Sequence, residues 1–191
     1  AFGVTISLSG PVSIDKTAGD GSIDVDVIID PQGVTVTGYT YFLGSDVSGV
    51  FDITARDTTT INGGAGASLT SLTTPDATVI GQGLDAWNAS DLGASNTGSE
   101  TLTATEVVAK FTLSYTAAAV DSLSSISLIV GQPPVDPPFG DGVTPKPAVY
   151  AQAGGGGGDM AVSSVVIDIV PEPASALLLL AGVPFLRRRR A

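Results

Sequence analysis

The stretch Ile23-Asp24-Val25-Asp26-Val27-Ile28-Ile29 alternates apolar and acidic residues with a period of two. In a β-strand this alternation directs the apolar side chains to one face and the aspartates to the other. The alternation breaks where Ile28 and Ile29 follow each other, and this predicts a β-bulge with one inserted residue. We therefore expect a long strand here, with one face against a core and the other in water.

The same period recurs along most of the chain. Glycine, aspartate, asparagine and proline, which favour turns, separate the runs from one another. No window combines an amphipathic helical pattern with capping residues at both ends. The further β-rich runs are residues 4–8, 34–43, 50–55, 107–115, 124–130 and 162–170. The pattern predicts an all-β fold, a single β-sandwich with jelly-roll or Greek-key strand order.

A proline- and glycine-rich stretch, residues 131–159, interrupts the strand pattern. It could be an ordered excursion within the domain or a flexible linker. Residues 160–170 look like one more strand, and this favours the excursion. We expect that last strand to return to the sheet beside the first, so that residues 1–169 form one domain.

Composition narrows the functions that are open to this domain. The 191 residues carry a net charge of −11, and four of the eight basic residues are Arg187 to Arg190. Without that cluster, four basic residues face 19 acidic ones, a net charge of −15. Nucleic-acid binding is therefore excluded, because phosphate backbones bind mainly through Lys and Arg. The chain has no histidine and no cysteine, which excludes Ser-His-Asp and Cys-His catalysis and zinc sites built on these residues. We expect a protein that is not an enzyme.

The C-terminal segment, residues 170–191, differs from the body in every part. It begins with Val170-Pro171-Glu172-Pro173-Ala174-Ser175, continues with an apolar run over residues 176–186, and ends with Arg187, Arg188, Arg189 and Arg190 before Ala191. The run is shorter than the roughly 20 residues of a spanning helix. An apolar run that ends in arginines nevertheless predicts a stop-transfer signal with its charges on the cytoplasmic side. The alternative is a final strand with a basic end.

These three parts, in this order and at the end of the chain, resemble the PEP-CTERM sorting signal. The resemblance implies export by a bacterium that makes extracellular polysaccharide, and processing by an exosortase-type protease. It implies that Pro171, Glu172 and Pro173 are the recognition residues and that the apolar run anchors the chain transiently in the inner membrane. A chain that starts at Ala1 fits removal of an N-terminal signal peptide. We therefore expect the protein at the cell surface or outside the cell.

The body carries a second, less specific resemblance. Residues 23–29, 33–43 and 108–113 are similar to strands of cohesin-type and carbohydrate-binding sandwich modules. This likeness implies a cohesin-like, jelly-roll arrangement of the predicted sandwich. It does not imply binding to a dockerin.

Two groups of residues in the body are candidates for ligand contacts. Exposed aromatic rings stack on sugars, so Tyr39, Tyr41 and Trp87 could contact a glycan, although a core position is the alternative for them. The early aspartates, Asp15 and Asp20 among them, could bind calcium. Alternatively, these aspartates cap turns or lie on a solvated strand face. No cofactor other than calcium is expected.

The sequence thus predicts a structural or adhesive protein of a polysaccharide or biofilm matrix. Two alternatives remain open: a carbohydrate-binding module, and a subunit that self-assembles by donating residues 160–170 to a neighbour.

Overall fold

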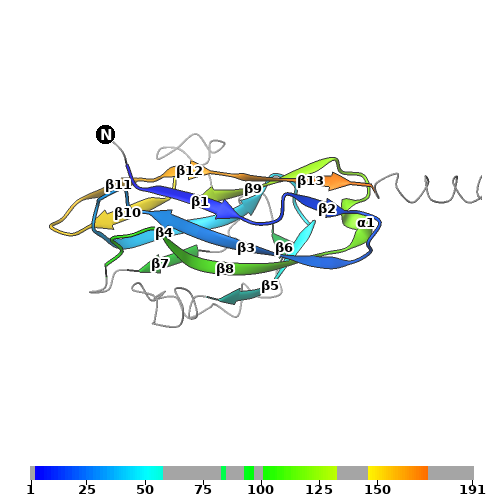
Figure 1. The fold of residues 1–191 in the computed structure, drawn as a ribbon, viewed down its shortest axis with the longest axis horizontal. Coiled ribbons are helices and arrows are strands. Elements are labelled where there is room, and N and C mark those ends of the chain that lie inside the picture. Colours follow the sequence, from blue (N-terminus) through cyan, green and yellow to red (C-terminus); the bar gives the residue numbers. More distant parts are fainter. Residues whose placement is uncertain (1–2, 58–82, 85–92, 97–100, 133–145, 172–191) are drawn as a thin grey trace, which may run out of the picture.

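The computed structural model describes residues 3–57, 83–84, 93–96, 101–132 and 146–171, and these form two packed β-sheets (Figure 1). Within these residues the first sheet contains six strands, and the second contains six in a row with a seventh paired to one of them. The strands of the first sheet, in spatial order, are β12 (Ala161–Ser163), β1 (Thr5–Ser9), β3 (Gly21–Asp30), β8 (Glu106–Tyr115), β5 (Phe51–Asp57) and β6 (Gly83–Leu84). The strands of the second are β11 (Gly157–Asp159), β10 (Val149–Gln152), β4 (Val36–Ser45), β9 (Ser125–Gly131), β13 (Val165–Val170) and β2 (Ser13–Asp15), with β7 (Gly93–Asn96) paired to β4. The all-β prediction is confirmed.

One hydrophobic core lies between the two sheets. Alternate residues of the central strands point into it, as the period of two requires. The first sheet contributes Ile6, Val25 and Phe111, all fully buried, and the second contributes Tyr41 and Ile126. The opposite faces are solvated: Asp24 is exposed on the outer face of the first sheet. The core thus follows the alternation that the sequence displays.

A β-bulge lies where β3 pairs with β8, but its extra residue belongs to β8, so the prediction of an inserted residue within residues 23–29 is wrong. The antiparallel register of β3 on β8 shifts between Val27 and Ile28, so that Val27 faces Ala109 and Ile28 faces Val107. The extra residue is Val108, which is buried next to the buried Ala109, whereas β3 keeps its alternation and buries both Val27 and Ile29. Ile28 therefore occupies an outward, half-buried position of β3, and the two successive isoleucines need no inserted residue in this strand.

The proline- and glycine-rich stretch belongs to the body in its described part. The backbone of Gln132 exchanges two hydrogen bonds with that of Lys146, at 2.8 and 3.1 Å, so these two described residues on either side of residues 133–145 are paired within the body. Strands β10 and β11 then form a hairpin at the edge of the second sheet. Its turn uses Gly154, Gly155 and Gly156 at φ of 86°, 89° and 100°. These angles favour glycine, which explains the glycine run.

The C-terminal β-rich run differs from its prediction as a single strand over residues 162–170. It divides at Ser164 into β12 in the first sheet and β13 in the second. Strand β12 pairs in parallel with β1, and β13 pairs in parallel with β2 and antiparallel with β9. The expectation that the last run lies beside the first is confirmed. Sequence alternation alone cannot reveal that both runs cross together from one sheet to the other.

The described residues include a single helical turn, α1 (Ala117–Val120). Thr116 caps it, because its hydroxyl accepts a hydrogen bond from the amide of Ala119 at 3.3 Å. The side chain of Asp20 accepts a second bond from the amide of Ala117 at 2.8 Å. The turn connects β8 to β9 at the end of the body where the tail begins. No helix in the described ranges is long and apolar enough to cross a membrane.

Candidate functional site

The last strand of the body ends where the sorting motif starts. β13 ends at Val170, and Pro171 follows it as an exposed residue without regular structure. Proline has no backbone N–H and cannot continue the pairing that the strand makes. The chain therefore leaves the second sheet at Pro171, at one pole of the body (Figure 1). The rest of the tail, residues 172–191 with Glu172, Pro173, Ala174, Ser175 and the four arginines, lies outside the described residues.

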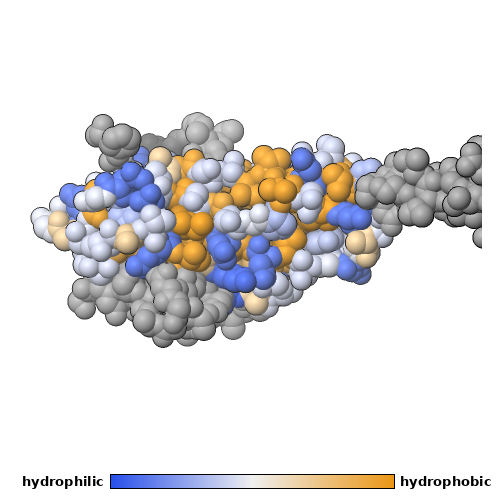
Figure 2. Space-filling view, viewed as in Figure 1, coloured by the Kyte–Doolittle hydropathy of each residue, from blue (hydrophilic) through white to orange (hydrophobic). Residues whose placement is uncertain are grey.

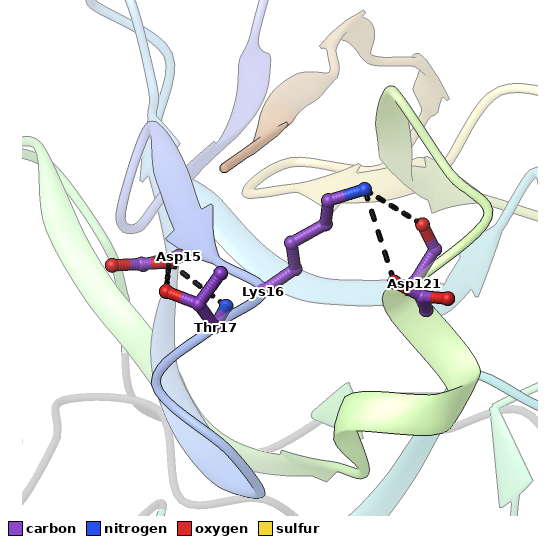
Figure 3. A network of polar contacts seen from close by, with 4 residues as sticks. All are labelled: Asp15, Lys16, Thr17 and Asp121. Carbon is purple, nitrogen blue, oxygen red and sulfur yellow. Dashed lines mark hydrogen bonds and ion pairs between the residues drawn. The ribbon is translucent and has the colours of Figure 1, made fainter. Parts of the chain in front are cut away.

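A polar network holds this exit in place, and we call it the exit clasp: Asp15, Lys16, Thr17 and Asp121 (Figure 3). The amide of Lys16 donates to the carbonyl oxygen of Val170 at 3.0 Å, the last backbone bond before Pro171. The ammonium of Lys16 donates to the carbonyl of Asp121 at 2.9 Å and lies 3.9 Å from its carboxylate. Lys16 thus connects the end of β13 to the residue that ends α1.

Asp15 stabilises the turn that presents Lys16. Its carboxylate accepts hydrogen bonds from the amide of Thr17 at 2.9 Å and from the hydroxyl of Thr17 at 2.7 Å. These two bonds, the hydroxyl bond foremost, lower the pKa of the Asp15 carboxyl below its ordinary value. Asp15 is half-buried, and both of its hydrogen bonds are made to the same neighbouring residue. It fixes the direction of the chain after β2.

The two aspartates proposed as calcium ligands both have hydrogen-bond partners within the chain. Asp15 bonds Thr17, and Asp20 bonds the amide of Ala117. Calcium requires six to eight oxygens that converge on one point. Across the described ranges, no group of three or more acidic, histidine or cysteine side chains could hold a metal ion. Calcium binding by Asp15 and Asp20 stays a prediction, and thermal unfolding scans with calcium and with a chelator would test it.

Tyr39 and Tyr41 lie in the core, so the prediction that they contact glycan is wrong. Tyr39 is 3% exposed and Tyr41 fully buried, and their rings stack with centroids 5.9 Å apart. Both project from β4 toward the first sheet because they occupy its inward positions. Burial removes the flat exposed ring that a sugar requires. Trp87, the third aromatic candidate, lies outside the described residues.

The hydroxyl groups of these tyrosines are unusual for a core. Within the part of the chain that the structure describes, neither hydroxyl has a hydrogen-bond partner. Burial raises the pKa of Tyr39 to about 12 and raises that of Tyr41 further, because the phenolate form would lose its hydration. Both groups therefore stay neutral, and their hydroxyls cost desolvation free energy.

We expect the substitution Tyr41→Phe to leave the protein at least as stable as before. Removing a buried hydroxyl without a partner also removes its desolvation cost, so the gain in unfolding free energy should be up to about 1 kcal/mol. Urea denaturation followed by circular dichroism measures it. A loss of stability of similar size would contradict the placement of this hydroxyl, since it would mean that the group makes a bond in solution.

An open cleft of about 470 Å³ lies near α1, where β3 begins and β8 ends. Its lining includes Asp20, Ser22, Asp52, Ser114 and Tyr115. The ring of Tyr115 packs edge to face on Phe51, with centroids 6.2 Å apart. The hydroxyl of Ser114 donates to the carbonyl of Asp52 at 3.4 Å. The cleft is open and its lining is about equally polar and apolar, and sequence reasoning missed it because strand pairing alone brings these residues together.

An ion pair lies on the outer face of the first sheet. The ammonium of Lys110 lies 3.0 Å from the carboxylate of Asp24, which also accepts a bond from the Thr112 hydroxyl at 2.8 Å. The hydrogen bond from Lys110, followed by that from Thr112, lowers the pKa of Asp24. Such exposed pairs contribute at most about 1 kcal/mol. Asp24 is exposed on this face, which agrees with the alternative that the early aspartates lie on a solvated strand face.

No protein-family model matches the chain, and no curated protein matches its sequence. The residues of the tail and the geometry of its exit from the body are the features that bear on function.

Proposed function

We propose that the protein is a non-enzymatic, exported bacterial surface or extracellular-matrix protein that is sorted and processed through its C-terminal Pro-Glu-Pro tail. Its role is structural or adhesive and linked to exopolysaccharide or biofilm. The observation that carries the proposal is the junction at Val170 and Pro171, where the last strand ends and the sorting motif starts with no intervening linker.

The tail acts in three steps under this proposal. Export passes residues 1–169 across the inner membrane, and the apolar run over residues 176–186 stops there with Arg187 to Arg190 on the cytoplasmic side. The anchor is transient, because the run is shorter than a standard span. An exosortase-type protease then recognises Pro171, Glu172 and Pro173 and processes the chain near them.

The geometry of the exit supports access to the motif. A protease cleft binds an extended segment, and proline favours extended backbone at the two positions that flank Glu172. Pro171 is exposed, and the exit clasp ties the chain down only as far as Val170. The cleavage motif would therefore be available immediately outside the folded body while the body stays closed.

For the body we propose a cohesin-like, jelly-roll sandwich that acts as a surface or matrix module. The carbohydrate-binding alternative loses two of its three aromatic candidates to the core. Self-assembly by donation of residues 160–170 would require β13 to leave both its partners, β9 and β2, and Met160 to leave the core. A structural role for the closed body needs neither event.

Fractionation of cells that produce the unaltered protein tests export and localisation. We expect the body outside the inner membrane, at the surface or in the medium, with a minor membrane-bound precursor. The measurement is an immunoblot of cytosol, membrane, surface and medium fractions, with a cytosolic enzyme as the control for lysis. Body confined to the cytosol would contradict the proposed function.

A further inference from the structure

The N-terminal segment, residues 4–16, and the C-terminal segment, residues 161–170, run side by side in parallel through both sheets (Figure 1). In the first sheet Thr5, Ile6 and Ser7 pair with Ala161, Val162 and Ser163. In the second sheet Ser13, Ile14 and Asp15 pair with Asp168, Ile169 and Val170. We call these two pairings together the parallel clamp.

Additional backbone bonds extend the clamp at its ends and at its crossing point. The amide of Ala161 donates to Val4 at 3.0 Å before the first pairing begins. The amide of Asp168 donates to Val12 at 2.9 Å, and the amide of Lys16 donates to Val170 at 3.0 Å. The two segments are therefore hydrogen-bonded to each other on both sides of the crossing from one sheet to the other.

Each segment is also bonded to the interior of a sheet. β1 lies between β12 and β3, with which it pairs over five residues, and β13 lies between β2 and β9, with which it pairs over four. The inward residues Ile6, Ile167 and Ile169 are buried in the common core. The outward side of β13 carries the exposed valines Val166 and Val170, and Val12 and Val162 are exposed as well. Figure 2 shows apolar surface on the face of the body that is drawn there.

This arrangement determines how the body responds to tension. The first segment starts at one pole and the second ends at the opposite pole, where the tail leaves (Figure 1). Tension between the two poles would slide the paired strands along their own axes. The hydrogen bonds of the clamp would then carry the load together, whereas tension across the end of a strand pair breaks its bonds one after another. Forced unfolding is governed by the unfolding barrier, which is higher when the bonds must break together.

We propose that the body is a load-bearing module along the line from residue 3 to residue 171, with the parallel clamp as its mechanical element. If the body is held at the cell surface, tension enters at the C-terminal end of the body. This part of the proposal rests on the proposed function. The clamp itself is a property of the folded chain. It gives the matrix protein a further activity, which is the transmission of tension without unfolding.

Single-molecule force spectroscopy on the full chain tests the proposal. The chain has no cysteine, so two introduced cysteines define the points of attachment without competition. The variant Gly3→Cys with Pro171→Cys loads the clamp lengthwise, and a Cβ at Gly3 meets no atom within 4 Å. The matched control, Gly3→Cys with Gln32→Cys, pulls β1 from β3 at the end where Thr5 pairs with Asp30.

We expect the lengthwise geometry to unfold at a force higher than the control by a factor of about two or more, because its hydrogen bonds share the load. Equal forces in the two geometries would overturn the proposal. The result is independent of tail processing, which intact mass reports separately.

A substitution within the clamp sharpens the test. Ala161→Pro removes the N–H that donates to Val4, and Ala161 is the first residue of its strand, a position where proline is tolerated. It should lower the unfolding force in the lengthwise geometry only, and Ala161→Ser, which keeps the N–H, should not. An unchanged lengthwise force in Ala161→Pro would contradict the assignment of the clamp. If this variant does not fold, the comparison of the two geometries alone decides.

Discussion

The double substitution Pro171→Ala with Pro173→Ala is expected to block processing of the tail. Without the two prolines, the segment after β13 loses its extended preference and the residues that a protease of this class would recognise. We expect the processed fraction to fall at least about tenfold, which corresponds to about 1.4 kcal/mol of lost discrimination. Immunoblots of membrane and surface fractions measure it, with uncleaved chain accumulating in the membrane.

Two further variants separate recognition from anchoring. Ser175→Ala alters the end of the motif without touching either proline, and it should be processed as the unaltered chain is. Replacement of Arg187 to Arg190 by serine removes the stop-transfer charges and should reduce membrane retention. Normal processing of the double proline variant would contradict the role assigned to the motif.

Substitution Phe111→Ala should have the largest effect on stability. Phe111 is fully buried on β8, a central strand of the first sheet, between Val25 on β3 and Arg56 on β5. The guanidinium of Arg56 lies 5.9 Å from the centroid of its ring. Loss of a buried aromatic ring leaves a cavity, and we expect a decrease of about 3–5 kcal/mol in unfolding free energy. Urea denaturation measures it.

The neighbouring residue supplies the control. Thr112 lies on the same strand but faces outward, where its hydroxyl donates to Asp24 at 2.8 Å. Thr112→Ala should cost about 1 kcal/mol or less, because the lost bond is exposed. If Phe111→Ala lowers the unfolding free energy no more than Thr112→Ala does, the assignment of Phe111 to the inward face of β8 is wrong.

Local patterns predicted the strands well because each strand is half buried. The alternation over residues 23–29 marked β3 and its inward face, and residues 107–115 likewise marked β8. The short strands β2 and β11 could not be found in this way, since three residues give no period, and β12 was predicted only as part of one run over residues 162–170. Their positions depend on partners that are distant in the sequence, such as Ser13 beside Asp168.

The candidate functional residues differ in the same way: a linear motif can be read from the sequence, whereas contacts between distant residues cannot. The tail is a linear motif, and its start at Val170 coincides with the end of β13. Tyr39 and Tyr41 were ambiguous, because aromatic residues at alternate positions serve a core and an exposed platform equally well. Only the packing of β4 against the first sheet decides for the core. The exit clasp likewise depends on Lys16 and Asp121, which lie 105 residues apart and meet through the fold alone.

The most direct test of the central claim is the intact mass of the protein recovered from the surface or medium of the bacterium that makes it. Processing through the tail predicts a chain that ends near Pro171 to Pro173 and lacks the apolar run and the four arginines. A recovered chain that still ends at Ala191 would contradict the claim, and a permanently anchored protein would then be the better account.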